Sequence, residues 1–375
     1  MRDTVKLAFC LFKYFPYGGL QRDFMRIAKE CVRRGHSVDV YTMQWDGELD
    51  PALAVTVIPV SGSQNRSRAK DFVKKFQSQI ECKNYDLVVG FNKMPGLDVY
   101  YAADTCYQAK AQHQRGLWYR FTPRYRHLVA YERAVFAADI PTRILLISKA
   151  QQAEFQRHYN TPDNRFDLLP PGIARDRIAP INAHKIRTEL RTEFNIADHE
   201  FLLLMVGSGF KTKGLDRTLL AIAALPDDLK KRTHLIIIGQ DHAEKFQRQA
   251  QRLAISKQIR FLGGRDDVPR FLLAADLLLH PAYNENTGTV LLEALVSGLP
   301  VITTDVCGYA SYVNQADAGV VLSSPFQQAK FNKTLIDVLS SSPLTQWQQN
   351  ALAFAQTADI YSMPERAADI IESLR

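Results

Sequence analysis

Short apolar segments alternate with amphipathic helical segments along most of this chain, and this alternation constrains its fold more than any other feature. Segments typical of buried parallel strands lie at residues 5–12, 38–43, 85–91, 144–148, 201–206, 235–239, 259–262, 277–282 and 300–304. Segments with helical periodicity lie at residues 20–34, 68–80, 215–225, 243–254, 288–297, 327–340 and 345–357. This order predicts parallel sheets that are covered by helices on both faces.

The alternation falls into two series, separated by a proline-rich stretch at residues 168–185 that has no periodicity. A chain of 375 residues is long for a single hydrophobic core. We therefore predict two doubly wound, Rossmann-like α/β domains, an N-terminal domain at residues 1–170 and a C-terminal domain at residues 171–359. The closing segment, residues 360–375, is predicted to form a helix that packs back onto the N-terminal domain.

The surplus of positive charge is confined to the first half of the chain. Residues 1–170 hold 25 Lys and Arg against 17 Asp and Glu, a surplus of 8, whereas residues 171–375 hold 22 of each kind. A surplus restricted to one domain predicts an anionic partner for that domain. A basic surface that is merely solvated would give the same counts.

The apolar runs and the cysteines of the sequence indicate the cellular compartment of the protein. No apolar run approaches the roughly 18 residues that a membrane-spanning helix needs, and residues 5–12 lead into a glycine loop rather than a cleavage site. The five cysteines are odd in number and lack metal-ligand spacing. We therefore predict a cytoplasmic protein with reduced thiols.

The sequence MVGSGFKTKGLDR places a glycine-rich loop between a buried strand and a helix. Gly207 and Gly209 permit a tight turn, and the N–H groups of such a loop can hold anionic oxygens at a helix N-terminus. The loop is not a Walker A motif, because Leu215 and Asp216 replace its Lys and Ser or Thr. Lys213 would contact a phosphate as a point charge. A plain glycine turn with solvated lysines remains the alternative.

A second loop, YNENTG, follows the apolar segment at residues 277–282. Thr287 is the predicted N-cap of the next helix, and the free N–H groups of residues 287–290 would attract an anion. Because ligands of doubly wound folds bind beyond the carboxyl ends of the strands, both loops are predicted to face one cleft.

Two glutamates accompany the second loop. Glu285 lies within it, and Glu293 lies among apolar residues of the following helix. A buried carboxylate needs hydrogen-bond partners, and sugar hydroxyls would supply them; a Glu293 side chain that reaches solvent is the alternative. In the first domain, Gly18 and Gly19 follow the first strand, where adjacent glycines let a ligand approach the backbone unless they form a simple turn.

In this order, the motifs resemble those of the retaining glycosyltransferases with the GT-B fold, in which two such domains face a central cleft. The shared elements are the early Gly-Gly loop, the loop that ends in Lys213-Gly214, and two glutamates separated by seven residues. Within that superfamily, KYFPYGGLQRDFMRIA, GFNKMPGLDVYYAAD, RYRH, LPPGI, KGLDR, AADLLLHPAY and VCGYA resemble the lipopolysaccharide core glucosyltransferase I family of Gram-negative bacteria, nearly from end to end.

The resemblance implies transfer of a hexose from a UDP-hexose, with retention of anomeric configuration. The acceptor would be an inner-core heptose of lipid-anchored lipopolysaccharide, at the cytoplasmic face of the inner membrane. UDP-glucose is the implied donor. Asn284, Asn286 and Thr287 flank Glu285 where relatives can have smaller side chains, which leaves UDP-N-acetylhexosamine open. Thr212 stands where relatives can carry Arg, so one contact to phosphate is either missing or supplied by Lys211.

The resemblance also assigns roles to residues. Glu285 would bind hydroxyls of the donor sugar, Glu293 would bind the ribose diol, and Lys213 and Arg177 would neutralise the leaving diphosphate. Further donor contacts are implied for Gly18, Gly19, Gly207, Arg265, Asn286, Thr287, Gly288, Thr289 and Val290. The side chains implied to face the transferred sugar or the acceptor are Asp23 and Asp104. The catalytic set is Glu285, Lys213, Arg177 and Asp104.

The sequence contains no Asp-x-Asp triplet of the kind that chelates a metal–diphosphate complex. The charge on the leaving UDP would then be balanced by Lys213, Arg177 and a helix N-terminus. We expect no metal and no cofactor, since the UDP-sugar is a substrate. Front-side attack is favoured, with the departing phosphate taking the acceptor's proton, because Glu285 and Glu293 are assigned to binding rather than to the paired carboxylate roles of glycosidases.

Residues 107–133, which we call the basic segment, hold six basic residues and one acidic residue. Aromatic residues lie between them, and amphipathic rings favour a membrane interface. Thr122 and Pro123 suit a helix start. The segment is predicted to dock on the anionic inner leaflet, unless it is a solvated basic face with its aromatic rings in the core. The residues predicted to contact the membrane are Lys110, Arg115, Trp118, Tyr119, Arg120, Phe121, Arg124 and Arg126.

Two other functions stay open. A related transferase could act on a different lipid acceptor, and a basic, non-catalytic membrane-binding adaptor could carry the same charge. Two phosphate-type loops in one domain count against the adaptor, which does not need them. No motif predicts a nucleic-acid partner.

Overall fold

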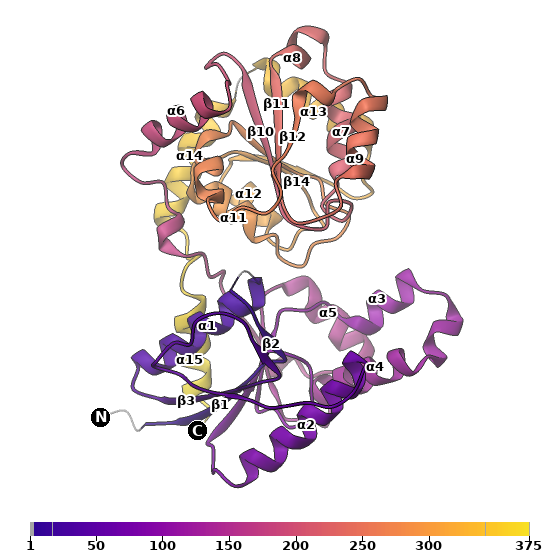
Figure 1. Ribbon diagram of the computed structural model, residues 1–375, viewed down its shortest axis with the longest axis vertical. Coiled ribbons are helices and arrows are strands. Elements are labelled where there is room, and N and C mark those ends of the chain that lie inside the picture. Colours follow the sequence, from indigo (N-terminus) through magenta and orange to yellow (C-terminus); the bar gives the residue numbers. More distant parts are fainter. Residues whose placement is uncertain (1–3, 17, 342, 375) are drawn as a thin grey trace. The chain divides into compact units, whose positions relative to one another are not determined.

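In the computed structural model, residues 4–16, 18–341 and 343–374 are described, and the chain divides into two compact units (Figure 1). Unit 1 comprises Met1–Gly172 and Tyr361–Arg375, and unit 2 comprises Ile173–Ile360. The chain thus crosses between the units at residue 172 and again at residue 360. The first crossing lies inside the proline-rich stretch 168–185. The ends of that stretch are ordered, because Leu168 ends strand β9 and helix α6 begins at Ala183.

Unit 1 is built on a parallel sheet with the strand order β5-β3-β1-β6-β7-β8-β9. The strands are β1 (Lys6–Cys10), β3 (Ser37–Thr42), β5 (Ala54–Val57), β6 (Leu87–Gly90), β7 (Val99–Ala102), β8 (Arg143–Leu146) and β9 (Phe166–Leu168). Two short strands, β2 (Lys13–Tyr14) and β4 (Gln44–Trp45), pair with each other. Strand order reverses between β1 and β6, which makes this the topological switch point of the unit.

Helices cover both faces of this sheet, as Figure 1 shows. They are α1 (Gly19–Arg33), α2 (Asn65–Glu81), α3 (Tyr107–Gln114), α4 (Pro123–Phe136), α5 (Lys149–Tyr159) and α15 (Met363–Glu372). Successive residues of β1 point to opposite faces of the sheet. Leu7 and Phe9 pack in the hydrophobic cluster that includes α1 and α15. Ala8 and Cys10 pack in the cluster that includes α2, α4 and α5. A strand buried on both faces must be apolar throughout, which explains the continuous apolar run.

The closing helix α15 packs against α1 in unit 1. Arg34, at the C-terminal end of α1, donates from Nη1 to Oδ1 of Asp369 at 2.8 Å. His36 Nε2 lies 2.9 Å from Oε1 of Glu372. The C-terminal segment therefore completes the first unit, although it follows the whole of unit 2 in the sequence.

Unit 2 contains a parallel sheet with the strand order β12-β11-β10-β13-β14-β15. The strands are β10 (Phe201–Val206), β11 (Thr233–Ile238), β12 (Ile259–Phe261), β13 (Leu277–His280), β14 (Val301–Thr304) and β15 (Gly319–Leu322). The helices are α6 (Ala183–Glu193), α7 (Leu215–Ala223), α8 (Asp227–Lys231), α9 (Glu244–Arg252), α10 (Val268–Ala274), α11 (Thr289–Val296), α12 (Ala310–Gln315), α13 (Gln328–Ser341) and α14 (Leu344–Thr357). Strand order reverses between β10 and β13, so this pair is the switch point of unit 2.

Candidate functional site

The two glycine loops predicted from the sequence meet at the switch point of unit 2. The first follows β10 and the second follows β13, and these strands are neighbours. Tyr283 N–H donates to the carbonyl of Thr212 at 2.8 Å, which joins the loops. Gly214, the N-cap of α7, has φ of +82°, and a Cβ there would overlap the carbonyl oxygen of Pro281. Only glycine combines that backbone conformation with so close an approach.

Lys213 and Glu285 form an ion pair across the two loops, between Nζ and Oε2. Both side chains are largely withdrawn from solvent, with 21% and 13% of their surfaces exposed. Burial lowers the pKa of Lys213. The sequence predicted both residues as ligand-binding groups, and the structure brings them together.

The start of α11 differs from the prediction. Thr287 is not its N-cap: Gly288 takes this position with φ of +79°, and α11 begins at Thr289. The positive φ explains the glycine, because a side chain would be strained there. Glu285 lies beside this turn, since a Cβ on Gly288 would stand 3.3 Å from its Cγ. The ion pair thus lies at the N-terminal end of α11, where the helix dipole favours an anion.

His280, the last residue of β13, was not singled out from the sequence. It is fully buried, and its Nε2 lies 3.5 Å from Oε2 of Glu285. Within the described part of the chain, neither ring nitrogen has a hydrogen-bond partner. Burial, and secondarily the charge of Lys213, lowers its pKa to about 3, so the ring is neutral at physiological pH. A polar residue that ends an apolar strand beside a glycine loop was the signal in the sequence.

Other predicted donor residues occupy the same edge of the sheet. Lys211 donates to Oδ2 of Asp216 at 2.5 Å and to the hydroxyl of Tyr283 at 3.0 Å. A phosphate contact from Lys211 in place of an arginine at position 212 stays a prediction. Arg265 follows β12 and makes two hydrogen bonds to Asp267, of 2.6 and 2.8 Å.

The predicted ribose ligand lies on α11, and the second predicted phosphate ligand lies in the 3₁₀ helix η3 (Arg175–Arg177). Glu293 is half-buried, between the buried residues Leu292 and Ala294. The backbone of Arg177 lies at the opposite end of α11 from Lys213, because its carbonyl accepts from Oγ of Ser297 at 3.4 Å. The length of α11 therefore separates the backbone of Arg177 from the ion pair, and the role predicted for its side chain stays a prediction.

In unit 1, Gly18 is the N-cap of α1 and the helix begins at Gly19. A Cβ on Gly19 would have no atom within 4 Å, so its backbone borders open space. Asp23 accepts a hydrogen bond of 2.8 Å from the hydroxyl of Tyr101, and burial raises the pKa of Asp23. These residues belong to unit 1, whereas Lys213 and Glu285 belong to unit 2.

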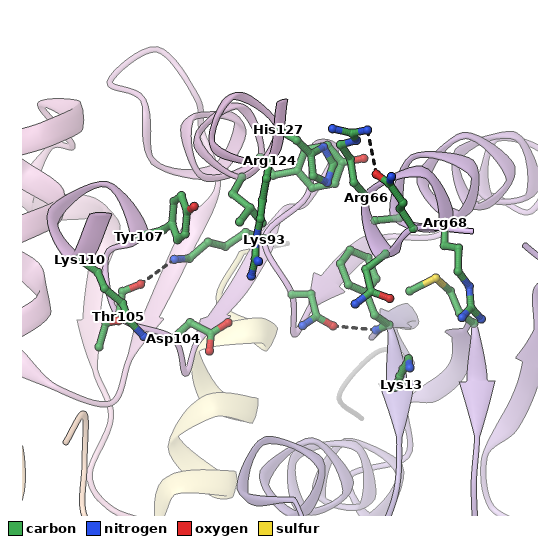
Figure 2. Close-up of a pocket in the computed structure, with 18 of the residues that line it drawn as sticks. Lys13, Arg66, Arg68, Lys93, Asp104, Thr105, Tyr107, Lys110, Arg124 and His127 are labelled. Atoms are coloured by element: carbon green, nitrogen blue, oxygen red, sulfur yellow. Dashed lines mark hydrogen bonds between the residues drawn. The ribbon is translucent and has the colours of Figure 1, made fainter. Parts of the chain in front are cut away.

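Asp104 lines a pocket of about 890 Å³ in unit 1 (Figure 2). We call this the basic pocket, because its described lining residues include six cationic side chains. These are Lys13, Arg66, Arg68, Lys93, Lys110 and Arg124. The pocket was not predicted from the sequence, in which these residues lie in segments far apart.

The basic segment, residues 107–133, forms α3, the 3₁₀ helix η1 (Leu117–Phe121) and most of α4. Thr122 is the N-cap of α4, and its Oγ1 accepts from Tyr125 N–H at 3.2 Å, as the prediction of a helix start requires. Trp118 is 85% exposed and Phe121 is 64% exposed, so these two rings are not in the core. Tyr119 and Tyr125 are half-buried, and the basic residues of the segment are exposed.

Two further observations concern the described residues alone. No group of three or more His, Cys, Asp or Glu side chains among them could hold a metal ion. None of the helices they form is both long and apolar enough to span a membrane.

Comparison with known proteins identifies the family. Residues 17–177 match the family model described as Glycosyltransferase Family 4, and residues 186–353 match that of Glycosyl transferases group 1. The lipopolysaccharide glucosyltransferase WaaG of Escherichia coli is 47% identical over 366 residues, which span 97% of this chain and 98% of the relative. The chain belongs to the lipopolysaccharide core glucosyltransferase I family.

Solved structures place this family member in the GT-B fold. A crystal structure of WaaG, a glycosyltransferase involved in lipopolysaccharide biosynthesis, matches 97% of this chain and 99% of its own with a TM-score of 0.90 and 47% identity. HepE of Anabaena in complex with UDP-glucose matches with a TM-score of 0.75 at 19% identity, over 98% of this chain and 100% of its own, which indicates the shared fold alone. The predicted family and the predicted fold are both confirmed, and the protein is a glycosyltransferase.

Proposed function

We propose that this glycosyltransferase transfers a hexose, with retention of configuration, from a UDP-hexose to an inner-core heptose of lipopolysaccharide. The observation that carries the proposal is the Lys213–Glu285 ion pair at the N-terminal end of α11, beyond the carboxyl end of β13. This is the position in which doubly wound folds bind anionic ligands. The identity shared with a lipopolysaccharide glucosyltransferase supports the choice of acceptor.

The ion pair suggests how the donor would bind. A diphosphate that approaches the start of α11 competes with Glu285 for Lys213, since both are anions that need the same cation. Once released, Glu285 can accept hydrogen bonds from hydroxyls of the sugar. The exchange leaves no buried charge unpaired, which is necessary because an unpaired buried charge is costly.

The same groups would assist the departure of UDP. Charge develops on the leaving phosphate as the glycosidic bond breaks, and Lys213 and the first N–H groups of α11 are fixed where they can stabilise it. The acceptor hydroxyl would attack on the face that the diphosphate leaves and pass its proton to that phosphate. We propose that no metal takes part, because cationic groups of the protein balance the charge.

His280 would support this site as a positioning residue. Its neutral ring lies 3.5 Å from Glu285 Oε2 and is sealed from solvent. A protonated ring in this position would compete with Lys213 for Glu285. Its lowered pKa prevents this competition at neutral pH.

We propose that the enzyme works at the inner face of the inner membrane, with the basic segment on the lipid surface. The exposed rings of Trp118 and Phe121 and the exposed arginines support this placement. Anionic lipids attract such a segment by about 1 kcal/mol for each basic residue near the surface.

The decisive experiment measures UDP release from UDP-glucose, UDP-galactose and UDP-N-acetylglucosamine, each with lipopolysaccharide core acceptors of defined truncation. We expect turnover that requires an exposed inner-core heptose, with UDP-glucose as the best donor. Preference for the N-acetylhexosamine would indicate that Asn284 and Asn286 shape the pocket for it. If no donor supports transfer to any core acceptor, the proposed function is wrong.

A thermal-shift measurement separates an enzyme from a non-catalytic adaptor. A ligand that binds only the folded state raises its stability, by about 2.7 kcal/mol at one hundred times its dissociation constant. UDP should therefore raise the melting temperature of the wild-type protein and raise it less in Lys213→Ala. An adaptor would show no shift with UDP.

A further inference from the structure

The basic pocket occupies the switch point of unit 1, the counterpart of the position that holds the two glycine loops in unit 2. Lys13 follows β1 and Lys93 follows β6, the two strands between which the order reverses. Phe12 N–H donates to Oδ1 of Asn92 at 2.7 Å, which joins the two segments that follow these strands, and both residues line the pocket. Because ligands of doubly wound sheets bind at such points, the pocket occupies a position suited to a ligand.

The side chains that line the basic pocket are mostly positively charged. The described residues that line it include six lysines and arginines and one carboxylate, that of Asp104. The cations come from distant parts of the chain, namely β2, α2, the loop after β6, α3 and α4. Figure 2 shows Lys110 on one side of Asp104, Lys93 above it, and Arg66, Arg68 and Lys13 on the other side. A concave surface lined by one sign of charge focuses the electrostatic potential and attracts the opposite charge.

One of these cations is already neutralised. Lys93 pairs with the buried carboxylate of Glu132 at 2.5 Å and donates to the carbonyl of Thr105 at 2.9 Å. Glu132 also accepts from the N–H groups of Tyr107 and Gln108, at the start of α3, at 2.8 and 3.0 Å. The N-terminus of α3 therefore has its own anion within the protein.

The remaining cations lack such partners. Among the residues that the structure describes, no carboxylate pairs with Lys13, Arg66, Arg68, Lys110 or Arg124. Arg66 and Arg68 lie within the first four residues of α2, and the first turn of α2 has no acidic residue. Positive side chains are unfavourable beside the positive end of a helix dipole. A bound anion would relieve this cost.

His127 supplies a second, independent observation that points to a ligand. It is 8% exposed and lines the pocket, and in the described chain its Nδ1 has no hydrogen-bond partner. Burial, together with the positive charges of Lys70 and Arg66, lowers its pKa. A buried polar atom without a partner costs free energy, which a ligand group in hydrogen-bond reach would recover.

We propose that the basic pocket binds acidic groups, carboxylates or phosphates, of the acceptor glycan and holds it by charges away from the sugar that is glycosylated. This inference rests on the proposed function, because it names the chemical class of the acceptor. Arginine forks pair with both kinds of anion through parallel hydrogen bonds. The neutral polar and aromatic lining, with Asn92, Tyr107 and Tyr131, suits sugar hydroxyls and ring faces.

The size of the pocket favours a glycan over a lipid headgroup. A volume of about 890 Å³ lies within the roughly 300–1,000 Å³ of small-molecule sites and has room for several sugar rings. The residues proposed to meet the membrane, such as Trp118 and Arg120, are not among those that line the pocket. The membrane surface and the pocket are therefore largely separate sets of residues, which share Lys110 and Arg124.

The test uses the full chain and Arg66→Gln combined with Arg68→Gln, which removes two charges from the pocket and none from the basic segment. The probe for binding is a deacylated, lipid-free inner-core oligosaccharide that keeps its acidic groups, measured by calorimetry. We expect the variant to bind it roughly tenfold or more weakly. In turnover, its acceptor KM should rise by a similar factor, while kcat and the KM for UDP-glucose stay within about twofold of wild type.

The matched control removes two charges from exposed positions of unit 1 outside the pocket. Lys74→Gln combined with Lys83→Gln changes the net charge equally and should leave oligosaccharide affinity unchanged. Because both arginines lie at a helix start, Lys13→Gln with Lys110→Gln is a second pocket variant made at exposed positions, and it should reproduce the loss. Far-UV circular dichroism and UDP-induced thermal shift report whether each variant is folded.

Three outcomes would overturn the inference. The first is equal oligosaccharide affinity in wild type and both pocket variants. The second is equal affinity for inorganic phosphate and for the oligosaccharide, which would indicate an anion site without glycan recognition. In the third outcome, the wild type does not bind the lipid-free probe, and the pocket variants lose the binding to vesicles of phosphatidylglycerol and phosphatidylcholine that the wild type shows. This result would assign the pocket to lipid headgroups. In each case transfer from UDP-glucose could persist, so the proposed function would be judged separately.

Discussion

The switch points of the two units hold charge in opposite ways. In unit 2, Lys211 and Lys213 follow β10, and each is paired with a carboxylate of the same unit. In unit 1, most of the described cations of the basic pocket have no such partner. The sequence already divides the charge in this way, with the whole surplus in residues 1–170. Two sheets of similar topology thus carry sites of different electrostatic character.

The difference corresponds to two kinds of binding. A paired cation gives a site that is neutral when empty, so a ligand must displace the internal carboxylate, and that carboxylate becomes available for a second contact. An unpaired cluster keeps a positive potential that attracts an anion from a distance and weakens with salt. The first arrangement suits a diphosphate that must leave in each turnover, and the second suits an anionic acceptor that must be captured at a surface.

The largest expected effect is at the paired site. Lys213→Ala removes a charge that stabilises the departing diphosphate, so kcat should fall by about two orders of magnitude, the scale of one lost electrostatic contact. Steady-state UDP release measures it. Lys211→Ala is the matched control, because this lysine is half-exposed and engaged with Asp216, and it should lose far less activity.

The variant Glu285→Ala separates binding of UDP from transfer of the sugar at the same site. Without the carboxylate, Lys213 has no internal competitor for the diphosphate, so UDP should bind at least as tightly as in the wild type while transfer is lost. Calorimetry with UDP and the turnover assay separate the two. Turnover like that of wild type in either Lys213→Ala or Glu285→Ala would contradict the site.

The next effect is at the basic segment. Changing Arg120, Arg124 and Arg126 to Ser should weaken binding to anionic liposomes by about 1 kcal/mol for each charge. Co-sedimentation with liposomes is the measurement, and wild-type binding should need anionic lipid and fall with added salt. Equal binding to neutral liposomes, or no change in the triple variant, would exclude this surface from docking.

A smaller effect concerns the stability of unit 2 at acid pH. The pKa of His280 is lowered from 6.5 to about 3 in the folded state, so between these values the unfolded chain binds a proton that the folded chain does not. Stability from this residue is therefore present above pH 6.5 and lost as pH falls towards 3, by up to about 1.4 kcal/mol per pH unit.

Urea unfolding between pH 7 and pH 4.5 tests this linkage. The variant His280→Gln should show a shallower loss of stability with falling pH than the wild type. His242→Gln is the control, because that side chain is 97% exposed and should leave the slope unchanged. An unaltered slope in His280→Gln would refute the burial effect.

The smallest expected effect is that of chelation. Activity should persist in excess EDTA, because Lys213 and the start of α11 are proposed to balance the charge of the leaving group. The turnover assay with and without EDTA measures this. Loss of activity that Mg²⁺ or Mn²⁺ restores would show that a set of metal ligands was overlooked.

Local patterns in the sequence predicted most elements of both sheets, since strands buried on both faces must be apolar throughout. Strands such as β5 and β9 were not predicted, because they are short and only partly buried at the sheet edges. Strand β7 was also not predicted, although it is buried throughout. The N-cap of α11 was misplaced by one residue, since sequence preference favours threonine and the geometry of the turn required glycine.

The sequence by itself determined the fold class, the family and the asymmetry of charge, because each depends on periodicity, motif spacing or composition along the chain. It also indicated Lys213 and Glu285, which lie in recognisable loops. Only the tertiary structure decided which charges are paired, that His280 lies beside Glu285, and that cations from β2, α2, α3 and α4 form one pocket. Electrostatic partners are set by distance in space, and residues such as Lys13 and Arg124 become neighbours only when the sheet brings its loops together.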